Sequence, residues 1–130
     1  GGNDVIRLTP YAPLEESIAR VAALARTQAR VVVLMPSGNV GSAPFFFPPW
    51  SWLMTERSKA LHGMIRQVAA DNGALYVNLY KEKSEDPFAQ RPDELNAKDG
   101  LHPSDAGYQL WYGELNRQAD LSRRLTALRR

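Results

Sequence analysis

The chain contains no cysteine, little net charge and no long apolar run. The absence of cysteine excludes disulfides and cysteine-ligated metals. It does not indicate whether the protein works in an oxidising or a reducing compartment. No apolar stretch is long enough to span a bilayer, so we expect no transmembrane segment. The formal net charge is only +2. Its excess lies near the C-terminal end, in Arg117, Arg123, Arg124, Arg129 and Arg130. Without a basic stripe interleaved with aromatics, these arginines predict a solvated helix face, and we expect no nucleic-acid partner.

What is present is typical of one globular domain. The chain has 130 residues, of which 44% are hydrophobic and 23% charged, so disorder is not expected. Short apolar runs predict strands at 31–35 and 74–79, the first of them fully buried. Apolar residues at helical spacing predict helices at 12–29, 53–72, 104–117 and 119–129. The alternation of helices and strands indicates an α/β fold with a parallel sheet.

Three segments between these elements predict loops. Residues 1–4 read as a loop at the end of a strand, because Gly1 and Gly2 allow unusual backbone angles. Residues 37–52 form a loop rich in glycine, serine, proline and aromatics. Residues 80–98 predict a polar, solvated loop, in which Asp86, Asp93 and Glu94 show no convergence toward a metal.

The strongest chemical pattern is Asp99-Gly100-Leu101-His102-Pro103, directly before a predicted helix that Ser104 would cap. A carboxylate three residues before a histidine can accept its Nδ1 proton across one tight turn, and Nε2 is then free to act as a base. An isolated Asp-x-x-His is more often a helix cap or a surface pair. A metal site made of Asp99, His102 and Asp105 is a weaker alternative, because the chain offers no further ligands.

The second pattern is Gly1-Gly2-Asn3-Asp4. The Asn3 amide could donate a hydrogen bond to a developing oxyanion, whereas Asp4 is expected to tie down the loop. Alone, the pattern would indicate an ordinary Asn-Asp turn. His62 has no acidic residue at a sequence spacing that is typical of a catalytic acid–histidine pair, so we expect it to have a structural role.

Together the two patterns resemble the SGNH (GDSL-like) hydrolase family, from residue 1 to about 117. The resemblance implies that Asp99 and His102 belong to a catalytic triad and that Asn3 belongs to the oxyanion hole. It also implies a flavodoxin-like, three-layer α/β/α sandwich with a five-stranded parallel sheet. On that template residues 1–130 form a single, incomplete domain that holds the last two strands and their helices.

The chain departs from the family in its serines. The family's nucleophile lies in an N-terminal Gly-Asp-Ser block, and none of the eight serines here has that context. We therefore expect the nucleophile in an N-terminal segment outside this sequence. That segment would be a partner of this chain, present as a separate polypeptide.

The function implied by the resemblance is a serine-dependent ester or thioester hydrolase acting on a small-molecule or lipid acyl substrate, without metal or cofactor. Alternatives are a carbohydrate O-acetyl esterase and a catalytically inactive fragment or interaction module. A flavodoxin-like ligand-binding domain is disfavoured, because no glycine-rich phosphate loop precedes a helix. The sequence assigns no cellular compartment.

The aromatic loop is the expected substrate contact. Five aromatic side chains in a proline-braced segment favour an apolar wall or lid for an acyl or aryl group. The alternative is that the loop packs on the domain's own core or on the missing half of the domain. The residues concerned are Phe45, Phe46, Phe47, Trp50 and Trp52.

Overall fold

The computed structural model describes residues 1–128, so Arg129 and Arg130 lie outside the described part. The two strands are β1 (Val33–Leu34) and β2 (Leu75–Tyr76). The helices are α1 (Gly2–Ile6), α2 (Tyr11–Gln28), η1 (Val40–Ser42, 3₁₀), α3 (Trp50–Asp71), α4 (Pro87–Gln90), α5 (Pro92–Leu95), α6 (Asp105–Ala119) and α7 (Leu121–Leu128). The predicted helices at 12–29, 53–72 and 104–117 are confirmed, and α7 confirms the predicted helix at 119–129 as far as residue 128.

The two strands are parallel, with Val33 opposite Leu75 and Leu34 opposite Tyr76. Successive residues of a strand point to opposite faces. Leu34 and Tyr76 accordingly pack against one hydrophobic core. Val33 and Leu75 pack against a second core. Helices therefore cover both faces of the strand pair, as the prediction of an α/β fold requires.

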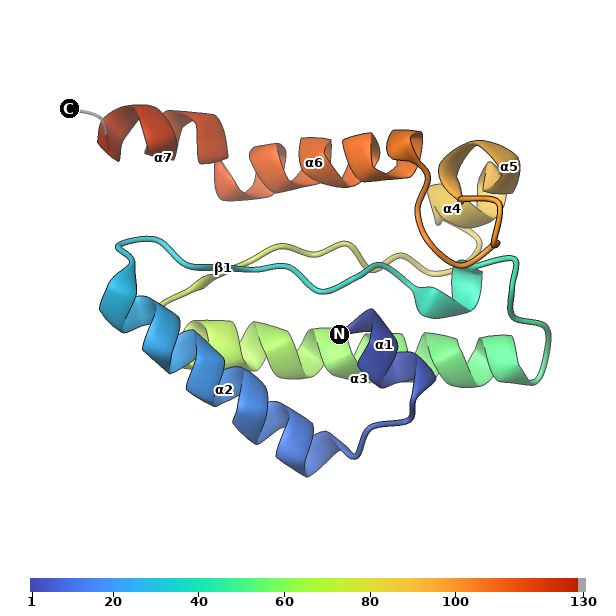
Figure 1. Ribbon diagram of the computed structural model, residues 1–130, viewed down its shortest axis with the longest axis horizontal. Coiled ribbons are helices and arrows are strands. Elements are labelled where there is room, and N and C mark those ends of the chain that lie inside the picture. The colour runs from blue at the N-terminus through green and yellow to red at the C-terminus, as the bar shows by residue number, and fades with distance from the viewer. Residues whose placement is uncertain (129–130) are drawn as a thin grey trace.

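The first core lies between the strands and the helices α1, α2 and α3. Its fully buried members are Val5, Met54, Leu61 and Ile65. Helix α2 packs mainly on α3 (Figure 1). Val21 on α2 is exposed.

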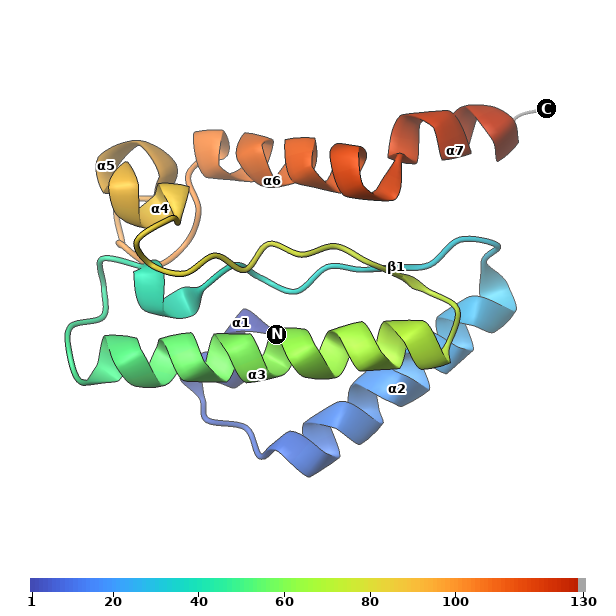
Figure 2. The ribbon, with the colours of Figure 1, turned by 180° about the vertical axis from the view of Figure 1, so that it is seen from behind.

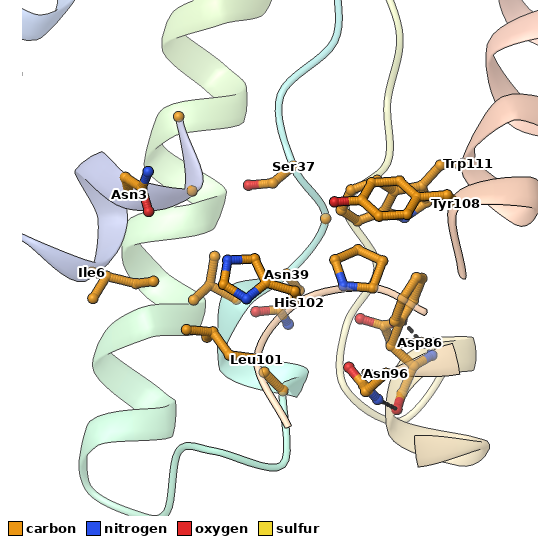
Figure 3. A pocket seen from close by; sticks show the side chains of 17 residues that line it. Asn3, Ile6, Ser37, Asn39, Asp86, Asn96, Leu101, His102, Tyr108 and Trp111 are labelled. Atoms are coloured by element: carbon orange, nitrogen blue, oxygen red, sulfur yellow. Dashed lines mark hydrogen bonds between the residues drawn. The ribbon is translucent and has the colours of Figure 1, made fainter. Parts of the chain in front are cut away.

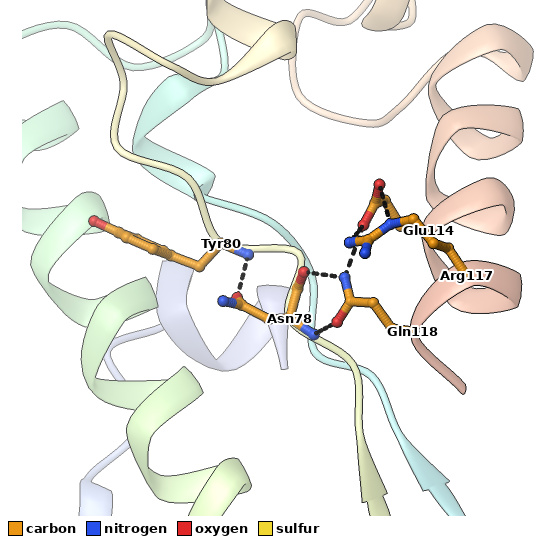
Figure 4. Close-up of polar contacts among 5 residues, drawn as sticks. All are labelled: Asn78, Tyr80, Glu114, Arg117 and Gln118. Carbon is orange, nitrogen blue, oxygen red and sulfur yellow. Dashed lines mark hydrogen bonds and ion pairs between the residues drawn. The ribbon is translucent and has the colours of Figure 1, made fainter. Parts of the chain in front are cut away.

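The second core lies under α6, on the opposite side of the strands in both views (Figures 1 and 2). Near the C-terminal end of α6, a side-chain amide joins the helix to the segment that follows β2. Gln118 Oε1 accepts the backbone N–H of Asn78 at 2.8 Å, and Gln118 Nε2 donates to the Asn78 carbonyl at 2.9 Å. Glu114 accepts from both Gln118 and Arg117 (Figure 4). These bonds hold α6 in register with the segment that leaves β2.

The strands are less buried than predicted. Residues 31–34 are half-buried and Met35 is exposed, although a fully covered strand was expected. The physical reason is that, within residues 1–128, β1 pairs only with β2, so its other edge has no neighbour. A five-stranded, flavodoxin-like sandwich stays a prediction.

All three predicted loops are wrong in part. Residues 37–52 contain η1 and the first turn of α3. Residues 2–6 form α1, because Val5 is buried against α3 and the Gly1 carbonyl accepts the N–H groups of Asp4 and Val5. Within the expected loop at 80–98, α4 and α5 form, and Asp86 is only 4% exposed. Asp86 is buried because its carboxylate caps α4, accepting the Phe88 N–H at 3.0 Å.

The surface charges agree with a solvated C-terminal face. Arg117 pairs with Glu114 and Arg123 with Asp120, and these arginines are exposed. None of the helices within residues 1–128 combines the length and apolar character that crossing a membrane requires.

Candidate active site

A tight loop between α5 and α6 positions Asp99 and His102. The loop is closed by two backbone bonds, from Ala97 N–H to the His102 carbonyl (2.7 Å) and from Ser104 N–H to the Leu95 carbonyl (2.9 Å). Gly100 sits at its tip with φ +68°, a left-handed conformation that other residues resist. Ser104 then caps α6 by accepting the Gly107 N–H, as predicted. The spacing of three therefore folds locally into one turn.

Within this turn the two carboxylate oxygens of Asp99 make different hydrogen bonds. Its Oδ1 accepts the backbone N–H groups of Leu101 and His102 at 2.9 and 3.0 Å. Its Oδ2 lies 2.6 Å from His102 Nδ1. The ring hydrogen bond and the two backbone bonds lower the pKa of Asp99 to about 2. Because Asp99 is thus ionised, Nδ1 carries the hydrogen, and Nε2 is the free, proton-accepting nitrogen.

The pair lies at the rim of a cavity and is open to solvent. The side chains of His102 and Asp99 are 64% and 50% exposed. The cavity has a volume of about 260 Å³, and His102 and Asn3 both line it (Figure 3). Asn3 reaches it from α1, and within residues 1–128 its amide makes no hydrogen bond. The structure thus brings His102 and Asn3, which lie 99 residues apart in the sequence, to the same cavity.

Sequence reasoning missed several other residues of the cavity wall. Ser37 and Asn39 follow β1, Asp86 precedes α4, and Tyr108 and Trp111 belong to α6. Burial raises the pKa of Asp86. Its place could have been found from Asp86-Pro87, an N-cap followed by a proline at the first helical position. No local pattern marks the others, because tertiary packing brings them to the cavity.

His62 is buried and lies behind this wall. Its Nε2 is 2.6 Å from the Ser37 carbonyl, and its Nδ1 is 2.5 Å from the Tyr76 hydroxyl. A carbonyl can only accept, so Nε2 carries the hydrogen and Tyr76 donates to Nδ1. Burial lowers the pKa of His62, which keeps the ring neutral. These contacts fit the structural role that the sequence suggested.

The aromatic segment lies beside the cavity and does not line it. Phe45, Phe47, Trp50 and Trp52 are exposed, whereas Phe46 packs against the first core. The two tryptophans belong to the first turn of α3 instead of the predicted loop. The segment is joined to the turn at residues 99–102 by one bond, from Phe45 N–H to the Gly100 carbonyl at 3.0 Å.

Neither a three-residue metal site nor a serine bonded to His102 forms within residues 1–128. Within residues 1–128 no group of three metal-ligating side chains converges, so Asp99, His102 and Asp105 do not form one. No serine hydroxyl in that same part of the chain hydrogen-bonds to His102. The described residues thus contain an acid, a base and an amide donor, but no serine engaged with the base.

Comparison with known proteins agrees with this chemistry. A family model described as the GDSL-like Lipase/Acylhydrolase family matches residues 1–110. The same kind of comparison with curated proteins and with solved structures gave no significant match. The matched range includes Asn3, Asp99 and His102.

Proposed function

Because the chain belongs to the GDSL-like lipase/acylhydrolase family, we propose that it supplies the acid, the base and an oxyanion donor of a serine-dependent ester or thioester hydrolase. The observation that carries this proposal is the cavity that His102 and Asn3 both line, with Asp99 bonded to Nδ1 of the imidazole. A proton acceptor and an amide donor facing one small cavity are what acyl transfer requires.

The proposed reaction runs in two halves. A serine hydroxyl attacks the acyl carbonyl while His102 Nε2 takes its proton, and Asp99 stabilises the imidazolium. The oxyanion of the tetrahedral intermediate accepts a hydrogen bond from Asn3. The intermediate collapses, and the leaving alcohol or thiol takes the proton from His102. Water then hydrolyses the acyl-enzyme by the same steps, releasing a carboxylic acid and the free serine.

We place the nucleophile outside residues 1–130. None of the serines has the family's Gly-Asp-Ser context. A segment that carries it would also find a surface here, since β1 has an unpaired edge next to half-buried apolar residues at 31–34. A parallel strand added at that edge would extend the sheet toward the five-stranded sandwich. We therefore include this segment, covalently joined or separate, as a partner of the chain.

The cavity favours a short apolar acyl group. It is small, and part of its lining is apolar, formed by the side chains of Ile6, Val40 and Ala43. A longer acyl chain would leave the cavity near Ala43 and reach the exposed aromatic segment, where Phe47 and Trp50 could cover it. The predicted substrate contacts of the aromatic side chains would then apply to long acyl chains only. Phe47→Ser should then slow hydrolysis of nitrophenyl octanoate and leave nitrophenyl acetate unaffected.

A carbohydrate O-acetyl esterase is the second candidate. Tyr108 and Trp111 line the cavity and meet edge to face, with ring centroids 5.9 Å apart. Aromatic faces of this kind stack on sugar rings, while the small cavity would take an acetyl group. Acetylated sugars and a chain-length series of nitrophenyl esters, assayed side by side, separate the two candidates.

The test of the proposed function is the variant Asn3→Ala in the enzyme assembled with its serine-bearing segment. Loss of one oxyanion donor costs about 3 kcal/mol in the transition state, so kcat should fall about a hundredfold while KM stays nearly constant. Arg7→Ala is the matched control, because Arg7 is an exposed residue directly after α1. Equal kcat values for Asn3→Ala and wild type would refute the role of Asn3.

A further inference from the structure

Ser37 belongs to the wall of the cavity that His102 and Asn3 share. Its Oγ atom is buried, and it has no hydrogen-bond partner within residues 1–128. A buried hydroxyl without a partner costs stability. In the view of Figure 3 the hydroxyl points from the segment after β1 toward α1, on the side of the cavity where Asn3 lies. A ligand that accepts a hydrogen bond from this hydroxyl would therefore supply the partner that it lacks.

The hydroxyl also lies against the turn that presents Asn3. A Cβ atom added to Gly2 would lie only 3.1 Å from Ser37 Oγ and 3.5 Å from Ser37 Cβ. Gly2 is thus in close contact with Ser37, and Asn3 is the next residue along the chain. Two side-chain donors, one amide and one hydroxyl, consequently enter the cavity from neighbouring positions.

The backbone of Ser37 is held from behind by His62. The neutral His62 ring donates from Nε2 to the Ser37 carbonyl at 2.6 Å, and Tyr76 fixes the other side of the ring. A buried imidazole with both nitrogens bonded has one orientation. His62 therefore acts as a positioning residue for Ser37, which limits where the hydroxyl can reach.

We propose that Ser37 is a substrate-binding residue whose Oγ–H donates a hydrogen bond to the acyl oxygen of the ligand, beside Asn3. The inference rests on the proposed function in one respect, the acyl nature of the ligand. Ester carbonyls and carboxylates present acceptors only, so a hydroxyl donor complements them. Ser37 makes no hydrogen bond to His102, which separates this role from that of the nucleophile.

The test is a titration of the chain with sodium hexanoate, the carboxylate that hydrolysis of a hexanoyl ester releases. The chain has two histidines, so the His102 Hε1 signal can be followed by NMR once His62→Gln has assigned the other. Loss of one hydrogen bond should weaken hexanoate binding about fivefold in Ser37→Ala. His62→Gln should also weaken it, by a smaller factor.

Ser51→Ala is the matched control, because Ser51 Oγ is likewise buried and unpartnered within residues 1–128 but does not line the cavity. Its hexanoate affinity should equal that of wild type. The inference is overturned if Ser37→Ala binds hexanoate like wild type, if wild type does not bind it, or if a fluorophosphonate modifies Ser37. A fivefold loss in Ser37→Ala together with an unchanged kcat in Asn3→Ala would support Ser37 and reject the proposed oxyanion hole.

Discussion

The two histidines of this chain differ in nearly every physical respect. His102 is 64% exposed and bonds a carboxylate on one side only, which leaves Nε2 free at the cavity. His62 is 5% exposed and uses both nitrogens in fixed hydrogen bonds. A base needs a free nitrogen, whereas a structural ring needs both nitrogens satisfied. The comparison teaches that the partners of the ring, more than its burial, assign its role.

The largest effect should come from removing the ring of His102. His102→Ala deprives the serine of its base, and we expect kcat for nitrophenyl butyrate to fall at least about a thousandfold. Stability should change little, because the ring is exposed. Initial rates and urea midpoints, measured on the enzyme assembled with its serine-bearing segment, check both statements. A variant that keeps one tenth of the wild-type kcat would remove His102 from the mechanism.

The next effect concerns the orientation of the same ring. Asp99→Asn keeps an oxygen for the N–H groups of Leu101 and His102, so the turn should persist. The amide cannot hold the Nδ1–H tautomer as the carboxylate does, so kcat should fall at least about a hundredfold, though less than in His102→Ala. Glu94→Gln serves as the control, since Glu94 is exposed and pairs with Arg91. Equal losses in both variants would show a general charge effect instead.

For His62 the expected loss is in stability. His62→Leu leaves the Ser37 carbonyl without its partner and removes the bond between the ring and the Tyr76 hydroxyl, which should cost about 2–3 kcal/mol of unfolding free energy. Urea unfolding measures this loss, and His62→Gln should recover part of it by donating to the carbonyl. If His62→Leu were as stable as wild type, the buried hydrogen bonds would contribute nothing.

The smallest effect is the pH dependence of stability. Burial lowers the pKa of His62 below its unfolded value of 6.5, so the unfolded state binds the proton first as pH falls. The stability is therefore full above pH 6.5 and declines below it, by at most about 1.4 kcal/mol per pH unit for one proton. Asp99, with a pKa of about 2, adds a further loss only below about pH 4. A flat urea midpoint between pH 7 and 5 would contradict the account of His62.

Local sequence was enough to predict the acid–base turn and the long helices. Asp99 and His102 meet because three residues span one tight turn. Gly100 adopts the positive φ at the tip of that turn, and the Ser104 hydroxyl caps the helix that follows. The helices follow from apolar residues at helical spacing, which is a property of neighbours along the chain.

Tertiary packing decided what the sequence could not predict. Two glycines disfavour a helix, yet α1 forms because Val5 enters the core. A charged residue is expected outside, yet Asp86 is buried as a cap. The strand at β1 was expected to be covered and is half-buried, because its second edge has no partner in the described part of the chain. The cavity wall at Ser37 depends on His62, which lies 25 residues further along the chain.

The most direct test of the acid–base assignment is fluorophosphonate labelling of the assembled enzyme, read by intact-mass and peptide mass spectrometry. Labelling requires an activated serine, and activation requires the base. We predict a label on one serine outside residues 1–130, its loss in His102→Ala and its retention in His62→Gln. A label on any serine of this chain, or one that survives in His102→Ala, would contradict the account.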